Sequence, residues 1–261
     1  MPMHHIRRGT GRPLLLLHGL GSHWRSWAPI LDALAAEREV IAVDLPGFGE
    51  TPPLAGEVSI ATMADAVTAF CAEQGLVAVD VVGSSMGARL VLELARRGVV
   101  GAVVSLDPGG FWKGWERVFF GTTIRLSIKL VRLLQPVMRA VTGNPISRTL
   151  LLAQFSAHPW ALSSELVLDE MRSFAEARSF DPLLASLVAS PMQEGMPRGS
   201  AKRPIAIVWG RQDRVCLPRQ AERAMARFPD AKLYWVERCG HFPMWDQPAE
   251  TVRIILETTR V

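Results

Sequence analysis

The sequence is poor in cysteine and has no long apolar run. Its 261 residues include three cysteines, Cys71, Cys216 and Cys239, which lie far apart and form no CxxC pair. This spacing excludes a zinc knuckle and a disulfide framework, and it suits a reducing cytoplasm. The apolar run Leu14–Leu17 is too short for a signal sequence or a membrane span. We therefore expect a cytoplasmic protein without a membrane anchor.

A charged tail is also absent. The formal net charge is +4 and the pI is about 9.3, but the arginines are spread along the chain, which argues against nucleic-acid binding. Hydrophobic residues make up 49% of the chain and charged residues 21%, and glycine and proline follow no period. Collagen-like and low-complexity chains are thereby excluded. What remains is a globular enzyme with one large domain or two small ones.

Short apolar runs along the chain predict buried β-strands. They lie at 13–18, 40–44, 79–83, 102–107, 205–210 and 232–236. Helical patterns separate them at 24–37, 60–74, 86–97, 219–228 and 249–258. Because this alternation buries parallel strands on both faces, it predicts an α/β fold with a doubly wound, mostly parallel sheet. The chemistry of such a sheet is expected at the carboxyl ends of its strands.

One segment breaks the alternation. Residues 111–199 show helical periodicity and scattered prolines without a strand pattern, which predicts an all-helical insertion into a core of residues 1–110 and 200–261. Its first helix is expected to carry the basic residues Arg125, Lys129, Arg132 and Arg139. The insertion also holds more apolar side chains than short helices need for one-sided packing, so we expect some of them to line a pocket. We interpret the insertion as a cap over that pocket, and the alternative is a helix that lies on a membrane surface.

The strongest motif is Gly83–Gly87, with the sequence GSSMG. It follows a predicted strand and begins a predicted helix, which is the context of a G-x-S-x-G nucleophile elbow. Glycines two residues on either side of Ser85 remove the Cβ atoms that would collide in so sharp a turn. Ser85 is therefore the candidate nucleophile. The helix that begins at Met86 offers free N–H groups to a developing oxyanion.

A serine hydroxyl needs an imidazole to accept its proton, and His241 is placed to provide it. His241 follows the strand at 232–236 by a few residues, so it is expected at the same edge of the sheet as Ser85. The segment His18–Gly21 ends the first apolar run at this edge, and the backbone N–H of Leu20 joins that of Met86 as the expected oxyanion hole. We interpret His18 itself as a hydrogen-bonded turn residue.

The third catalytic member must be an acid at the end of a strand. Asp213 follows the run at 205–210 and Asp107 follows the run at 102–107. We favour Asp213, because Gly210 supplies a turn and Pro218 opens the next helix. Asp107 is interpreted as a residue that caps its own turn, and Asp44 as a carboxylate that structures a loop.

Tryptophans gather near the predicted site. Trp24 follows the oxyanion turn and Trp112 lies at the start of the insertion, so both are candidate substrate contacts in an aromatic-lined, apolar pocket. Trp27 is expected to pack its helix on the sheet. Trp245, four residues after His241, is a third candidate contact. The pattern includes no metal site and no cofactor motif.

Five segments together resemble the α/β-hydrolase superfamily. They are His18–Gly21, Asp44–Gly49, Gly83–Gly87, Trp209–Asp213 and Gly240–Pro243, in that order. The resemblance implies an eight-stranded, mostly parallel sheet, a lid inserted after the sixth strand, and the chain order Ser, Asp, His of the catalytic residues. The sequence departs from the family in two places. The N-terminus is too short for a full first hairpin, so one edge strand fewer is expected, and Asp246 stands where relatives usually have a structural Glu.

The nucleophile narrows the expected reaction. Similar haloalkane dehalogenases and epoxide hydrolases carry Asp at the elbow, whereas this chain carries Ser85. We therefore expect a serine hydrolase that cleaves small-molecule carboxylic esters with an apolar acyl or alcohol part. One alternative is a carbon–carbon bond hydrolase of diketone-type aromatic degradation products, with Trp245 and a cap arginine as substrate contacts. A second is a slow, hydrolase-like binding protein. The sequence does not indicate an oligomeric state.

Overall fold

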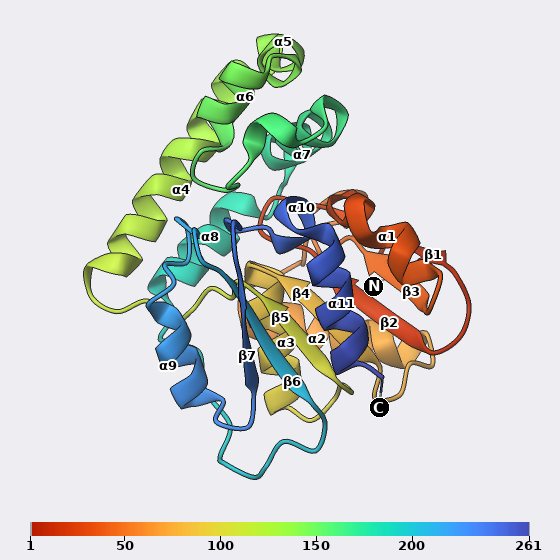
Figure 1. The fold of residues 1–261 in the computed structure, drawn as a ribbon. Coiled ribbons are helices and arrows are strands. Elements are labelled where there is room, and N and C mark those ends of the chain that lie inside the picture. The colour runs from red at the N-terminus through yellow and green to blue at the C-terminus, as the bar shows by residue number, and fades with distance from the viewer. Residues whose placement is uncertain (1, 261) are drawn as a thin grey trace.

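The computed structural model describes residues 2–260 and contains, within that range, a single seven-stranded sheet (Figure 1). Its strands stand in the order β1-β3-β2-β4-β5-β6-β7. They are β1 (His5–Arg8), β2 (Pro13–Leu17), β3 (Glu39–Val43), β4 (Asp80–Ser84), β5 (Val103–Leu106), β6 (Ile205–Gly210) and β7 (Lys232–Val236). β1 pairs antiparallel with β3, and every other pairing is parallel. The predicted α/β fold is confirmed, and β1 is the antiparallel edge strand of the described sheet.

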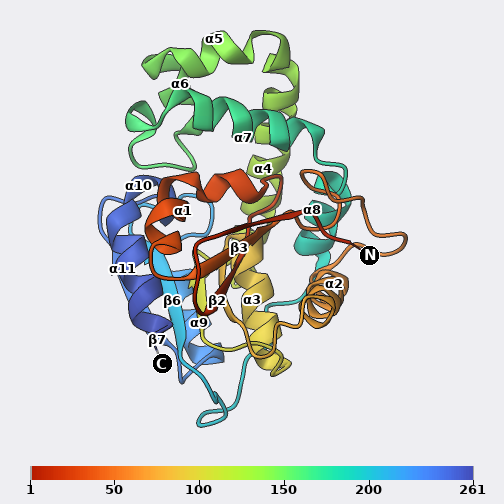
Figure 2. The ribbon, with the colours of Figure 1, turned by 90° about the vertical axis from the view of Figure 1, so that its right-hand side faces the viewer.

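Helices cover both faces of the sheet, as expected for a doubly wound fold. Around it lie η1 (Trp24–Trp27), α1 (Ala28–Ala35), α2 (Ile60–Glu73), α3 (Met86–Arg96), α9 (Gln220–Arg227), α10 (Pro243–Asp246) and α11 (Pro248–Thr258). Helices α1 and α11 pack together on one face, and α2 and α3 on the other (Figures 1 and 2). The predicted helix at 24–37 begins as a 3-10 turn, because Pro29 favours a helix start at the following turn.

The central strands are apolar along their whole length because both of their faces are covered. Leu14–Leu17 of β2 have no exposed surface, and the same holds for Val81 and Val82 of β4. Burying one such side chain contributes about 1.5–3 kcal/mol to folding. This core holds the carboxyl ends of the strands in fixed positions, and the functional residues lie there.

The segment between β5 and β6 is helical. It comprises α4 (Trp115–Leu134), η2 (Gln135–Val137), α5 (Met138–Gly143), α6 (Pro145–Leu152), η3 (Pro159–Ala161), α7 (Ser164–Glu176) and α8 (Phe180–Ala189). In Figures 1 and 2 these helices stand over the carboxyl ends of the strands. The expectation that Arg139 belongs to the first helix is wrong. Pro136 lacks an N–H and its ring clashes with the preceding turn, so α4 ends at Leu134 and Arg139 lies on α5.

Within residues 2–260, no helix is both long enough and apolar enough to cross a membrane.

Candidate active site

Ser85 occupies a strained turn between β4 and α3. Its backbone has φ of 56° and ψ of −111°, a region that residues with a Cβ rarely adopt. A Cβ atom on Gly83 would come within 2.1 Å of the Gly87 carbonyl oxygen, and one on Gly87 within 2.2 Å of the Leu17 oxygen. Both glycines are therefore required by the close approach of the backbone, and the turn points the Ser85 side chain out of the sheet.

The structure brings Ser85, His241 and Asp213 together. Ser85 Oγ lies 2.8 Å from His241 Nε2, and His241 Nδ1 lies 2.9 Å from Asp213 Oδ2. Because the carboxylate can only accept, Nδ1 carries the proton and Nε2 is free to accept one from the serine hydroxyl. The other carboxylate oxygen, Oδ1, accepts N–H groups from Val215 at 2.7 Å and Cys216 at 3.0 Å. The acid is thereby held in one orientation behind the imidazole.

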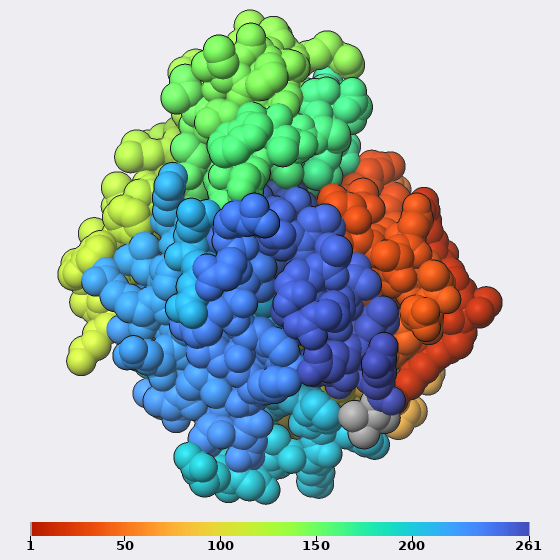
Figure 3. All heavy atoms as spheres, viewed as in Figure 1, coloured from red at the N-terminus to blue at the C-terminus, as the bar shows by residue number. Residues whose placement is uncertain are grey.

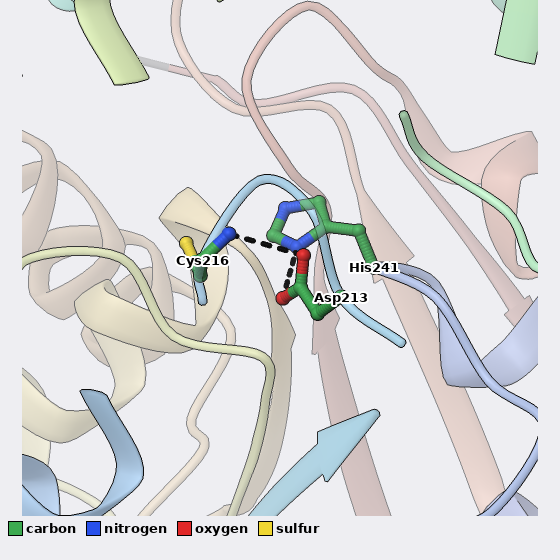
Figure 4. A group of neighbouring side chains, drawn as sticks. All are labelled: Asp213, Cys216 and His241. Atoms are coloured by element: carbon green, nitrogen blue, oxygen red, sulfur yellow. Dashed lines mark hydrogen bonds and ion pairs between the residues drawn. The ribbon is translucent and has the colours of Figure 1, made fainter. Parts of the chain in front are cut away.

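Asp213, Cys216 and His241 offer three ligand atoms within 4.8 Å of one another, a grouping that some metal sites share. Figure 4 shows that the backbone nitrogen of Cys216, and not its sulfur, faces the carboxylate. Burial raises the pKa of the Cys216 thiol well above its usual range, so the thiol stays protonated. With both carboxylate oxygens engaged, the arrangement fits the orientation of an imidazole better than the binding of a cation.

Leu20 and Met86 border the same cavity as Ser85 and His241. Gly19 lies so close to the nucleophile that a Cβ added there would be 3.3 Å from Ser85 Cβ. Within residues 2–260, the backbone N–H groups of Leu20 and Met86 donate to no protein acceptor. The predicted oxyanion donors are therefore unpaired next to the serine, which is the condition for binding a developing negative charge.

His18 lies beneath this loop. Its Nδ1 is 2.8 Å from the Gly19 oxygen, and its Nε2 accepts the Leu45 N–H at 2.9 Å. Burial lowers the pKa of His18 to about 4, so the ring is neutral at physiological pH. Both ring nitrogens are engaged with backbone groups, which leaves His18 a turn-holding role.

Asp107, the other acid considered from the sequence, lies at the end of β5 and is completely buried. Its Oδ1 accepts the Gly210 N–H at 2.8 Å, and among the described residues its Oδ2 has no hydrogen-bond partner. Burial, followed by the charge of Asp213, raises the pKa of Asp107 well above its usual range. Asp107 therefore fixes the turn leading to Asp213 through its bond to Gly210, and no bond joins it to His241.

An apolar cavity extends from Ser85 toward the cap. Its cap side is built from Phe120, Ile124, Ile128, Leu151, Leu152, Phe155, Met171, Phe174, Phe180 and Leu187. Ser22 and Ser127 add hydroxyl groups. An apolar lining of this kind suits an apolar chain beside the nucleophile.

The structure places one of the three candidate tryptophans on the cavity wall. Trp112 lines the cavity and stacks on Phe120 with ring centroids 4.5 Å apart. Trp24 instead lines a separate polar groove, where its backbone N–H donates to Asp44 Oδ1. Trp245 is buried, its Nε1 donates to the Ser26 oxygen, and it does not line the cavity. Trp27 is fully buried in the core, as expected.

Arg89 was not singled out from the sequence, although its position one helical turn after Ser85 is a usable signal. It is the one Lys or Arg on the cavity wall. Its three guanidinium nitrogens donate to Gln193 Oε1, Ser190 Oγ and the Pro191 oxygen at 2.9–3.1 Å. Burial lowers its pKa to about 10, so it stays charged. Arg89 therefore ties α3 to the segment after α8, with each nitrogen already engaged.

Asp246 joins the catalytic histidine loop to the cap. Its Oδ2 accepts the N–H groups of Gly240 at 2.7 Å and Ala157 at 2.8 Å, and its Oδ1 accepts the Ser156 hydroxyl at 2.5 Å. The His241 N–H donates to the Phe155 oxygen at 2.7 Å. The structural role expected for Asp246 is thus visible as a clamp that holds the cap loop against the residue before His241.

A second contact between cap and core centres on Glu170 of α7. This side chain is buried, and its Oε1 accepts the hydroxyl of Ser22, a residue of the cavity wall, at 3.1 Å. Its Oε2 has no hydrogen-bond partner among the described residues. His23 Nε2 lies 4.0 Å from Glu170 and 3.0 Å from Asp169, but burial lowers the pKa of His23. Burial raises the pKa of Glu170 to about 8.

Glu170→Gln is expected to stabilise the protein at alkaline pH. The pKa of Glu170 is about 8 in the folded protein and about 4.3 in the unfolded chain. The protonated side chain therefore contributes its full share to the free energy of unfolding below about pH 4.3, and this share is lost as the pH rises from there through about 8. Within that window the loss is about 1.4 kcal/mol per pH unit, and the glutamine variant should escape it. Thermal unfolding measured from about pH 5 to pH 9 checks this. The exposed Glu176→Gln on the same helix is the control, and parallel curves for wild type and Glu170→Gln would contradict the prediction.

Comparison with known proteins places this geometry in a family. The family model described as "Alpha/beta hydrolase family" matches residues 14–254. The 2-hydroxy-6-oxononadienedioate/2-hydroxy-6-oxononatrienedioate hydrolase 2 of Pseudomonas putida is 28% identical over 271 aligned positions, which cover 98% of this chain and 91% of that protein. An uncharacterised protein of Mycobacterium tuberculosis is 27% identical, with coverage of 95% of this chain and 75% of the relative.

A solved structure has the same fold. A thermophilic esterase from Thermogutta terrifontis superposes with a TM-score of 0.76 at 20% identity, covering 99% of this chain and 93% of that one. The match to the family model covers strands β3 to β7 and all of β2 except Pro13, and β1 lies outside it. It also covers Ser85, Asp213 and His241. On this match, and on the sheet and elbow described above, the chain belongs to the alpha/beta hydrolase family and is a hydrolase.

Proposed function

We propose that this hydrolase cleaves carboxylic esters with an apolar acyl or alcohol part, through an acyl-enzyme formed on Ser85. The observation that carries the proposal is the hydrogen-bonded series from Ser85 Oγ through His241 to Asp213 at the base of an apolar cavity. A neutral ester of this kind needs no charged partner in the cavity.

The reaction follows from the positions of the atoms. Ser85 Oγ attacks the ester carbonyl carbon as its proton passes to His241 Nε2, while the N–H groups of Leu20 and Met86 bind the oxyanion. Collapse of the tetrahedral intermediate breaks the bond to the alcohol oxygen, which takes the proton from His241. Water then attacks the acyl-enzyme with His241 again as the base, and releases the acid and Ser85. Asp213 holds the imidazole and stabilises its charged form.

Carbon–carbon hydrolysis is the second candidate, favoured by the similarity to the dienedioate hydrolase of Pseudomonas putida. A dioic acid brings two carboxylates, which need cationic or hydrogen-bonding partners when they are buried. The cavity wall offers one cation among the described residues, Arg89, and three of its five N–H groups are engaged within the protein. The expected contact Trp245 does not line the cavity. The exposed Arg125, Lys129 and Arg139 of the cap do not line the cavity. The cavity therefore suits an uncharged ester better than a dicarboxylate.

The rate of ester hydrolysis is expected to depend on acyl length. Each buried methylene contributes about 0.8 kcal/mol, so kcat/KM for p-nitrophenyl esters should rise several-fold per added pair of carbons until the cavity is full, and then fall. We expect the maximum at medium acyl length rather than at acetyl. A series of esters measured at a fixed enzyme concentration checks this.

The control is a 2-hydroxy-6-oxo-dienedioate, followed by the loss of its conjugated absorbance. Ester turnover that exceeds turnover of this diketone by about a hundred-fold or more in kcat/KM supports the proposal. The reverse order would assign the chain to carbon–carbon hydrolysis, and a flat dependence on acyl length would remove the cavity from the acyl-binding role.

A further inference from the structure

The cap carries an unusual outer surface. Ten large apolar side chains are strongly exposed in the described residues, and nine of them lie between Trp115 and Trp160; Val77 is the tenth. Large apolar side chains gathered on one part of a surface mark an interaction site, whereas scattered ones do not. Five of the nine belong to one helix, α4: Trp115, Val118, Leu126, Leu130 and Leu133.

Helix α4 is apolar on two opposite sides. Its inner side, with Phe120, Ile124 and Ile128, is buried over the cavity. Its outer side presents Leu126 and Leu133, which are 61% and 76% exposed and lie two turns apart. At 20 residues the helix is about 30 Å long, and it runs along the left edge of the molecule in Figures 1 and 3. From the sequence, a cap over a pocket and a helix on a membrane surface were alternatives. In the structure the inner side of α4 can serve the first role and its outer side the second.

Cations accompany these leucines. The pairs Arg125–Leu126, Lys129–Leu130 and Arg132–Leu133 repeat at intervals of four and three residues, so a basic row lies beside the apolar row. Arg132 pairs with Asp181 at 2.8 Å. Arg125 and Lys129 form no ion pair within residues 2–260, and both are exposed.

Positive charge is concentrated in the part of the cap that carries the exposed apolar side chains, residues 113–160. Residues 113–160 contain seven Lys or Arg and a single acid, Glu116, so their formal charge of +6 exceeds the +4 of the whole chain and leaves −2 for all other residues. Glu116 is buried and is neutralised by Arg219 and Arg223, so it does not offset the outer surface. Asp181 of α8 is exposed and offsets Arg132, but it leaves Arg125 and Lys129 without an acidic partner among the described residues. A basic, apolar segment whose one acid is buried complements an anionic lipid surface.

We propose that the outer side of α4 docks on an anionic lipid bilayer, with its leucines at the boundary of the acyl chains and Arg125 and Lys129 against lipid phosphates. A second copy of the chain fits this surface less well, because two segments of like charge would face each other. Docking of this kind is peripheral, since no helix among residues 2–260 can cross a membrane. The opposite side of the docked helix forms part of the cavity wall, so the bilayer and the cavity would lie on the two sides of α4.

Vesicle co-sedimentation of the full chain tests the proposal. We expect binding to vesicles with about one third phosphatidylserine and at least about ten-fold weaker binding to pure phosphatidylcholine vesicles. Raising NaCl from about 50 mM to 500 mM should weaken binding by a similar factor. Leu126→Ser with Leu133→Ser, and separately Arg125→Gln with Lys129→Gln, should each reduce binding about ten-fold.

Matched controls keep the outcome specific. Val77→Ser removes an exposed apolar side chain outside the cap, and Lys202→Gln with Arg203→Gln removes two exposed cations on a distant loop. These variants should bind like wild type. Absence of binding to anionic vesicles, equal loss in the controls, or a dimer in solution that dissociates in the leucine variant would each overturn the proposal.

Measurements of ester hydrolysis distinguish a failure of the docking proposal from a failure of the proposed esterase reaction. Hydrolysis of a short, soluble p-nitrophenyl ester should be unchanged in both pairs of α4 variants, because none of the four side chains lines the cavity. Ser85→Ala should bind vesicles like wild type. Failure of vesicle binding would therefore leave the esterase proposal intact, and failure of ester turnover would leave the docking proposal intact.

Discussion

Ser85→Ala is expected to abolish ester turnover while the protein stays folded. The alanine removes the Oγ that lies 2.8 Å from His241 Nε2, and the loss of a triad serine typically lowers kcat on the order of 10⁶-fold. The fold should survive, since alanine deletes a single side-chain oxygen and the turn is set by Gly83 and Gly87. Steady-state kinetics on the preferred p-nitrophenyl ester, with circular dichroism for folding, check both expectations.

A fluorophosphonate probe gives the matching positive result. It should label Ser85 and spare Ser84, whose side chain is fully buried on β4. Labelling of Ser84, or an alanine variant with full activity, would contradict the assigned nucleophile. A wild-type chain that is labelled yet turns over neither ester nor diketone would instead favour the binding-protein alternative.

The part of the site that could be predicted from sequence is the part fixed by local backbone geometry. The elbow at Gly83–Gly87 can be recognised from the sequence because its glycines are required at close backbone contacts. The strands can be recognised because parallel strands buried on both faces must be apolar. His241 and Asp213 follow from strand order, since parallel strands end at the same edge. The structure then supplies the distances that local patterns do not contain.

Contacts between distant segments could not be predicted in the same way. Trp24 and Trp245 lie at the right positions along the chain, but neither lines the cavity: Trp24 borders a separate groove, and the Trp245 Nε1 donates to the Ser26 oxygen. The packing of α4 against α7 and α8 decides which of its apolar side chains face inward. The apolar content of the helix therefore did not show which side chains line the cavity and which are exposed. The partners of Glu170 are equally invisible, because Ser22 lies 148 residues away in the sequence.

Asp213→Asn carries the second large expected effect. The carboxylate accepts the proton of His241 Nδ1 at 2.9 Å, and its other oxygen accepts two backbone N–H groups. An asparagine that keeps those two bonds must turn its NH₂ group toward the imidazole, which then holds the proton on Nε2, where it can no longer accept from Ser85. We expect kcat to fall by about 10⁴-fold with little change in the unfolding temperature.

Asp107→Asn is the matched control, because it makes the same chemical change in the neighbouring buried acid. Burial raises the pKa of Asp107 and so favours the uncharged form of its carboxyl, which an uncharged amide resembles, and the amide can still accept the Gly210 N–H through its oxygen. Its kcat should stay within about ten-fold of wild type, a loss of at most about 1.4 kcal/mol in transition-state stabilisation. If Asp107→Asn lost the larger share of activity, the catalytic acid would belong to β5, and the hydrogen bond between Asp213 and His241 would have to be read as structural.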